Sequence, residues 1–194
     1  MMPVMPKRDG RRQTRIVTHA SAKPEPPTIE LPAVESVLDF GCGLGRNFSY
    51  LKTIAREVSG FDVPEALAGC EGHPTYGTDR LSNDWNVTRQ RRFDLIFASL
   101  VLEHLPTERV AGFLDDFAPM APYVYVLTRA RSDSGAAILD LVVESRAYDP
   151  GPCRILDHDP STHRFRVVGE ASFDAARRSP DDLHYEVLLR SRVF

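Results

Sequence analysis

The chain has 194 residues, of which 42% are hydrophobic, and its formal net charge is −3. This size and composition predict one folded domain with a full hydrophobic core. The small negative charge excludes a global basic field that would attract nucleic acid or an anionic membrane, so any polyanion binding has to be local.

Cysteine usage and the N-terminal residues predict the compartment. The three cysteines, Cys42, Cys70 and Cys153, are an odd number and form no C-x-x-C pair. This spacing argues against a disulfide framework and against a zinc site. The N-terminus has no apolar core of signal-peptide length, and no other stretch approaches a membrane span. We therefore expect a cytoplasmic protein.

Residues 1–32 differ in composition from the rest of the chain. They hold six of the fifteen prolines and show little apolar periodicity. Such a segment is typical of a flexible arm, and residues 33–194 then form the folded domain. A lid over a substrate, or an arm that contacts RNA, is the alternative. The arm carries a basic cluster of Lys7, Arg8, Arg11, Arg12 and Arg15.

From residue 35 onward, short apolar runs alternate with helical patterns. This alternation predicts βα units and an α/β fold with a mostly parallel sheet. Strands are expected at 36–40, 57–63, 74–79, 93–99, 123–128, 164–168 and 184–190. Helices are expected at 46–55, from Pro64, at 107–120 and at 135–147.

Three glycines follow the first strand in the pattern Asp39-x-Gly41-x-Gly43-x-Gly45. A glycine-rich turn between a strand and a helix N-terminus lets backbone N–H groups face a ligand closely. A P-loop would end in Gly-Lys-Ser/Thr, and a dinucleotide fingerprint would need a glycine where Arg46 stands. Both phosphate-binding interpretations are therefore disfavoured.

Three motifs together resemble the class I S-adenosylmethionine-dependent methyltransferase family, with type-11-like features. They are "VLDFGCGLGRN", "GFDVPEAL" and "FDLIFASLVLEHL", and they run in the family's order from Val37 to Leu105. The resemblance implies a Rossmann-like fold with a seven-stranded, mostly parallel sheet and helices on both faces. It also implies the strand order 3-2-1-4-5-7-6, with an antiparallel last strand, and S-adenosyl-L-methionine as cofactor.

The resemblance assigns the cofactor's methionyl and ribose portions to the first motif and the second strand. The first-motif residues are Asp39, near the cofactor's amino group, with Phe40, Gly41, Cys42 and Gly43 around the turn. Asp62 matches the acid that accepts hydrogen bonds from both ribose hydroxyls. The alternative for Asp62 is a helix N-cap ahead of Pro64.

The resemblance places adenine between the second and third strands and the reacting methyl after the fourth. Val63 would supply an apolar wall for adenine, and Asn83 or Asp84 could bind its exocyclic amine. Trp85 belongs to the same candidate set, and a polar surface turn with Trp85 as core packing is the alternative. The methionyl end would be lined by Ala98, Ser99 and Leu100.

The stretch "LEHL" supplies the candidate catalytic residues Glu103 and His104. A histidine near the methyl donor has a near-neutral pKa and could act as a general base. The alternative is that "LEHL" shapes the turn into the next helix, since methyl transfer often needs only alignment of a good nucleophile.

The fifth strand ends in "TRAR", which places Thr128, Arg129 and Arg131 at the mouth of the expected site. Arginine can bind a carboxylate or phosphate in a bidentate manner, so Arg129 predicts an anionic acceptor. The alternative is that these arginines point into solvent. A small-molecule acceptor is expected, with nucleic acid or protein acceptors as alternatives and no membrane partner.

Several other functions are disfavoured. The Asn/Asp-Pro-Pro-Tyr motif of adenine N6 and glutamine methyltransferases is absent after the fourth strand. Pro152-Cys153 is expected in a loop, and Cys153 is not taken as a nucleophile. The group Asp157, His158, Asp159 and His163 is interpreted as a solvated loop, so no metal site is predicted. A non-catalytic cofactor-binding subunit and an NAD(P)-dependent oxidoreductase remain the rival functions.

Overall fold

A computed structural model describes residues 26–67, 80–129, 138–159, 161, 164–176 and 183–194. The strand expected at 74–79 lies outside these residues, as do Cys70, Arg131 and His163.

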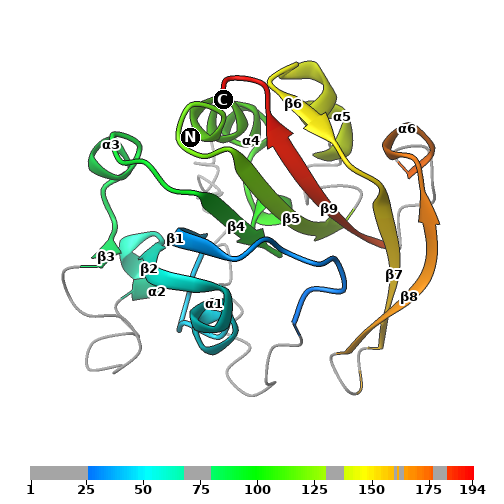
Figure 1. Cartoon of the computed structure of the whole chain (residues 1–194), viewed down its shortest axis with the longest axis horizontal. Coiled ribbons are helices and arrows are strands. Elements are labelled where there is room, and N and C mark those ends of the chain that lie inside the picture. Colours follow the sequence, from blue (N-terminus) through cyan, green and yellow to red (C-terminus); the bar gives the residue numbers. More distant parts are fainter. Residues whose placement is uncertain (1–25, 68–79, 130–137, 160, 162–163, 177–182) are drawn as a thin grey trace, which may run out of the picture.

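The described strands form one nine-stranded sheet in the order β3-β2-β1-β4-β5-β9-β7-β8, and β6 pairs with β9 (Figure 1). The strands β3, β2, β1, β4 and β5 are parallel, and β9 is antiparallel to β5. Their bounds are β1 (Val34–Phe40), β2 (Ala55–Phe61), β3 (Leu81–Ser82), β4 (Leu95–Ser99), β5 (Tyr123–Arg129), β6 (Tyr148–Pro150), β7 (Cys153–Asp159), β8 (Arg164–Ala171) and β9 (His184–Ser191).

The predicted order holds, with β9 as the antiparallel last strand next to β5. The strand number and the sixth strand differ from the prediction. The strand beside β9 is β7, which was expected to be a loop, and the predicted strand at 164–168 lies in β8 at the edge of the sheet. In β7 only Cys153 and Leu156 are buried, so the strand lacks the period-two alternation that would predict it.

Helices cover both faces of the sheet, as expected: Figure 1 shows α4 and α5 above it and α1 and α2 below it. The helix α4 is amphipathic, and its apolar stripe Val110, Phe113, Leu114 and Phe117 is buried. Within the described chain, no helix is both long and apolar enough to cross a membrane. The helices are α1 (Phe48–Ile54), α2 (Pro64–Leu67), α3 (Trp85–Thr88), the 3-10 helix η2 (Leu102–His104), α4 (Thr107–Phe117), α5 (Ile138–Glu144) and α6 (Phe173–Ala176).

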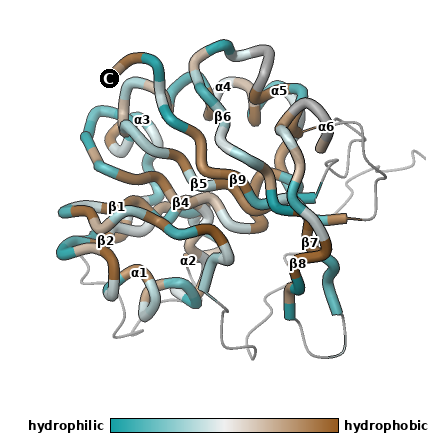
Figure 2. The backbone as a smooth tube through the Cα atoms, turned by 45° about the vertical axis from the view of Figure 1, so that its right-hand side comes forward, coloured by the Kyte–Doolittle hydropathy of each residue, from teal (hydrophilic) through white to brown (hydrophobic). Residues whose placement is uncertain are grey.

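Two hydrophobic cores lie on opposite sides of the sheet because successive strand residues point to opposite faces. In β1, Leu38 belongs to the core between the sheet and the helices α4 and α5. Val37 belongs to the core between the sheet and α1. Figure 2 shows the most hydrophobic backbone in the central strands β1, β4, β5 and β9, while the far ends of β7 and β8 are hydrophilic.

An aromatic cluster packs at the carboxyl ends of β1 and β2. The rings of Phe40 and Phe61 stack with centroids 5.4 Å apart, and the Trp85 ring meets Phe61 edge-on at 5.1 Å. The Trp85 indole N–H donates to Asp116 Oδ2 over 2.7 Å. The hydrogen bond and the ring contacts join α3 and α4 to the strand ends that lead into the glycine turn.

The buried carboxylate of Glu186 holds the N-terminal segment against the sheet. Glu186 is 1% exposed and accepts hydrogen bonds from Tyr125 Oη at 2.7 Å, from Thr28 N at 2.8 Å and from Ile29 N at 3.2 Å. The Thr28 hydroxyl donates to it as well. Leu31 packs in the core between the sheet and α1. Residues 26–32, which the sequence assigns to the arm, therefore contact the folded domain.

We expect Glu186→Ala to lower the free energy of unfolding by on the order of 3 kcal/mol, because Tyr125 and the two backbone N–H groups lose their shared acceptor. Tyr125→Phe removes one donor and leaves the segment bound, so its cost should be about 1 kcal/mol. Urea unfolding of both variants measures the difference. Equal losses would contradict the assignment of Glu186 as the group that holds residues 28 and 29.

Candidate active site

The glycine turn after β1 depends on left-handed backbone. Gly41, Gly43 and Gly45 have φ of 74°, 49° and 75°, a region that favours glycine. The N–H groups of Gly41 and Cys42 both donate to the Phe61 carbonyl, at 2.8 and 3.1 Å, which joins the turn to the end of β2. A Cβ atom on Gly41 would lie 2.3 Å from Val101 Cγ2. Only glycine therefore fits at position 41.

Gly43 differs from Gly41, because a Cβ atom there would meet nothing within 4 Å. Its N–H donates to Asp62 Oδ2 at 2.7 Å, and Val63 N donates to Asp62 Oδ1 at 2.7 Å. Burial raises the pKa of Asp62, and these two backbone hydrogen bonds oppose the rise. Both oxygens of Asp62 thus bind N–H groups outside α2, so Asp62 positions the glycine turn rather than capping that helix.

The first-motif acid, Asp39, lies beneath the turn. It is fully buried, and Asn47 Nδ2 donates to its Oδ1 over 3.3 Å. Asn47 is the N-cap residue of α1, so this contact joins β1 to the start of the helix. Because it has no exposed surface, the Asp39 carboxylate stabilises the turn through this contact and does not face solvent.

Arg46 is a candidate site residue that the sequence analysis does not include. Its Nη2 donates to the Ser99 carbonyl over 3.2 Å, which brings a guanidinium to the carboxyl end of β4. Leu100, the next residue, has φ 55° and donates its N–H to the Leu127 carbonyl of β5 at 2.7 Å. In the sequence Arg46 argues only against a dinucleotide motif, and the cation directly after the glycine turn is the signal that could have marked it as a candidate.

The other predicted cofactor residues fall into two groups. Phe40, Cys42 and Ala98 have buried side chains, so only their backbones could face a ligand, whereas Val63 is 46% exposed. Asn83 is exposed, and Asp84 caps α3 by accepting from Asn86 N at 2.9 Å. The Trp85 ring lies in the aromatic cluster, which is the core-packing alternative rather than a site wall.

Glu103, His104 and Arg129 meet at the carboxyl end of β5. Glu103 is 4% exposed and its Oε2 accepts from Arg129 N at 2.8 Å. Its Oε1 lies 3.7 Å from both Arg129 Nε and His104 Nε2. The side chains of Arg129 and His104 are 55% and 59% exposed, respectively. A buried carboxylate therefore orients two cationic or ionisable side chains that remain accessible.

Cys153 and its neighbours lie in a strand rather than in the expected loop. Cys153 is fully buried at the start of β7, and burial raises the pKa of its thiol to about 12. A thiol with this pKa stays protonated at neutral pH and is a poor nucleophile. Asp157, His158 and Asp159 lie further along β7. No group of three potential metal ligands occurs among the residues that the structure describes.

The comparisons with known proteins agree with this architecture. A family model described as a methyltransferase domain matches residues 9–166, which is most of the chain. No curated protein matches the chain.

Several solved structures share the fold. An S-adenosylmethionine-dependent methyltransferase from Archaeoglobus fulgidus is 16% identical, with a TM-score of 0.55 over 81% of this chain and 86% of that one. The N-methyltransferase NodS from Bradyrhizobium japonicum, solved with S-adenosyl-L-homocysteine, is 17% identical, with a TM-score of 0.55 over 82% and 79%. A TehB-like methyltransferase from Corynebacterium glutamicum is 18% identical, with a TM-score of 0.55 over 84% and 83%.

The family match covers the glycine turn, the acid after β2 and the residues after β4, and the sheet has the strand order that those motifs imply. The chain therefore belongs to the methyltransferase-domain family and is a class I enzyme whose cofactor is S-adenosyl-L-methionine.

Proposed function

We propose that this enzyme transfers the methyl group directly to a small or mid-sized anionic acceptor. The observation that carries the acceptor class is the position of Arg129. Arg129 is the last residue of β5 and its side chain is half-exposed, and β5 pairs with β4 at Ser99 and Leu127. In open parallel sheets ligands bind at the carboxyl ends of the strands, so Arg129 faces the region where the acceptor would lie.

The residues around Gly43 and Asp62 fit the adenosine portion of the cofactor. The space beside Gly43 leaves room for a ligand against bare backbone. Asp62 accepts one N–H on each oxygen and retains a lone pair on each for the two ribose hydroxyls. The exposed Val63 side chain would cover one face of adenine, and Asn83 follows Ser82, which pairs with the end of β2.

Arg46 fits the methionyl carboxylate. Its guanidinium donates one hydrogen bond, to the Ser99 carbonyl, among the residues that the structure describes, so the other N–H donors remain for a carboxylate. The buried Asp39 would act through Asn47 and the turn.

Bound S-adenosylmethionine supplies a methyl group on a positively charged sulfur, which needs no further activation. The chain then has to align the acceptor with that methyl group and exclude water. Glu103 is too deeply buried to take a proton from an acceptor, and its contacts make it a positioning residue for Arg129. His104 is exposed enough to accept a proton from an acceptor, and we propose that role for it.

Calorimetric titration with S-adenosyl-L-homocysteine, followed by incubation of cell extracts with isotopically labelled methyl donor, tests this function. The expected results are saturable binding and label in a small anionic product. Label found only in RNA or protein would contradict the acceptor class.

The two glycines offer a matched test of the cofactor site. Gly43→Ala places a methyl group in open space, so it should cost about 1 kcal/mol of stability through its left-handed φ and should weaken S-adenosyl-L-homocysteine binding. Gly41→Ala also forces a clash with Val101, so its stability loss should be larger by about 1–3 kcal/mol. Urea unfolding and calorimetry separate these effects. Unchanged binding by Gly43→Ala would contradict the pocket assignment.

Arg129→Ala should raise the apparent KM of an anionic acceptor by about tenfold or more, because a charge-assisted contact is lost. Affinity for the cofactor should stay the same, since Arg129 is not assigned to its pocket. His104→Ala is the matched variant: as a base it should lower kcat without changing KM. An uncharged acceptor that parent and Arg129→Ala convert equally well would refute the anionic class.

A further inference from the structure

His184, at the start of β9, lies next to Arg129. The register pairs the two residues directly, and opposite residues in antiparallel strands share one face of the sheet with Cβ atoms about 5 Å apart. His184 is 5% exposed, and its Nδ1 is a buried atom without a hydrogen-bond partner among the described residues. A buried polar atom without a hydrogen bond lowers the stability of the fold, and a ligand that bonds to this nitrogen would remove that cost.

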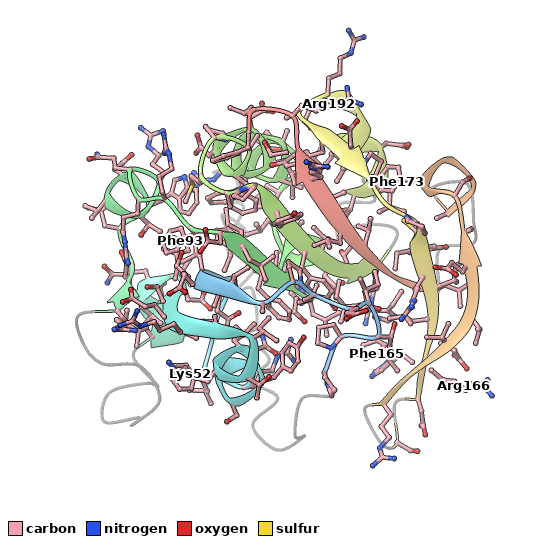
Figure 3. All side chains as sticks on the ribbon, viewed as in Figure 1. Lys52, Phe93, Phe165, Arg166, Phe173 and Arg192 are labelled. Carbon is pink, nitrogen blue, oxygen red and sulfur yellow. The ribbon has the colours of Figure 1, made fainter. Side chains whose placement is uncertain are left out.

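Two other rings enclose the imidazole. The centroid of His158 in β7 lies 5.4 Å from that of His184, and Phe165 in β8 lies 5.0 Å away, edge-on. Figure 3 shows Phe165 on the inner side of the β7–β8 hairpin, whereas Arg166 points away from the sheet. Burial, together with Arg129 and His158 nearby, lowers the pKa of His184 to about 4. The imidazole is therefore neutral at neutral pH.

We propose that Arg129 and His184 form a two-point site for a carboxylate group of the acceptor. The guanidinium supplies the charge, and the neutral imidazole supplies one N–H donor from the adjacent strand. This inference rests on the proposed function, because it names the group by which the acceptor is held.

A carboxylate suits the site better than a phosphate. The buried Glu103 carboxylate, 3.7 Å from Arg129 Nε, already offsets part of the arginine charge. The remaining positive charge matches a monoanion, and a dianionic phosphate would face a carboxylate behind the arginine. The Phe165 ring adds flat apolar surface beside the imidazole, which favours a planar group such as an aromatic acid.

Anion binding should couple to proton uptake. A bound carboxylate favours the imidazolium, so the pKa of His184 rises from about 4 on binding, and affinity increases as pH falls from about 7 to about 5. Among the described residues, the ionisable groups on the same face as His184 include Arg129 on β5, Arg154 and His158 on β7, and Glu186 on β9. The His158 ring lies 5.4 Å from that of His184, so His158 needs its own variant.

The experiment uses the full chain saturated with S-adenosyl-L-homocysteine and labelled with nitrogen-15 at histidine. Benzoate is the probe, and benzamide and phenyl phosphate are its neutral and, at about pH 7, dianionic counterparts. Benzoate should shift the imidazole signals of His184, and its Kd should rise at least about tenfold in both His184→Gln and Arg129→Gln. His158→Asn, the matched control, should keep the binding and its pH dependence.

The outcomes are separable. Equal benzoate binding by parent and His184→Gln, or equal binding of benzamide, overturns the two-point site, and stronger binding of phenyl phosphate overturns the choice of carboxylate. Retained cofactor binding in His184→Gln shows that the variant is folded. Should the parent fail to bind S-adenosyl-L-homocysteine yet bind benzoate through both residues, the cofactor assignment fails and the anion site stands.

Discussion

The absence of a side chain at Gly41 is the constraint on which the whole site depends. Val101, which follows β4, comes so close that a single added carbon would overlap it, and the positive φ excludes other residues independently. The same turn is bound to β2 through the Phe61 carbonyl and through Asp62. These contacts fix the carboxyl ends of β1, β2 and β4 relative to one another. The positions of the candidate cofactor residues depend on that arrangement.

The charged groups of the site are held before any ligand arrives. The Arg46 guanidinium is hydrogen-bonded to a strand carbonyl, and Asp62 accepts hydrogen bonds from two backbone N–H groups. The Arg129 guanidinium forms an ion pair with the buried Glu103 carboxylate. Each retains hydrogen-bonding capacity after those contacts are made. Such preorganisation lowers the ordering cost of binding, which is how a small domain can align two substrates without large rearrangement.

The amino-terminal half of the fold was predictable because its signals are local. All five residues of β4 are buried, so an apolar run identifies it, and the glycine spacing identifies the turn. The carboxyl-terminal half gave weaker signals: β6 has three residues, and β7 and β8 are largely exposed on one or both faces. The contact of Thr28 with Glu186 joins residues 158 positions apart, and no pattern within a window of sequence encodes it.

Within the candidate site, the sequence alone determines the position of some residues in the fold but leaves that of others open. Asp62 follows a strand next to the glycine motif, and its position could be read directly. Trp85 is equally suited to a core and to a ligand wall, and only the neighbouring rings of Phe61 and Phe113 decide between them. His184 carried no motif at all, because its importance arises from the strand that pairs with it.

The position of β9 gives the fold an order of assembly. It follows all the other described strands in sequence, yet it lies between β5 and β7, so the β7–β8 hairpin has no sheet to join until β9 has been synthesised. Glu186, the residue that holds the N-terminal segment, arrives with the same strand. During synthesis the parallel cofactor-binding half can form while β5 is still an open edge that could pair with another chain. Pairing of β9 with β5 closes that edge and brings Glu186 to Thr28 and Ile29, and contacts this distant in sequence add to the folding barrier.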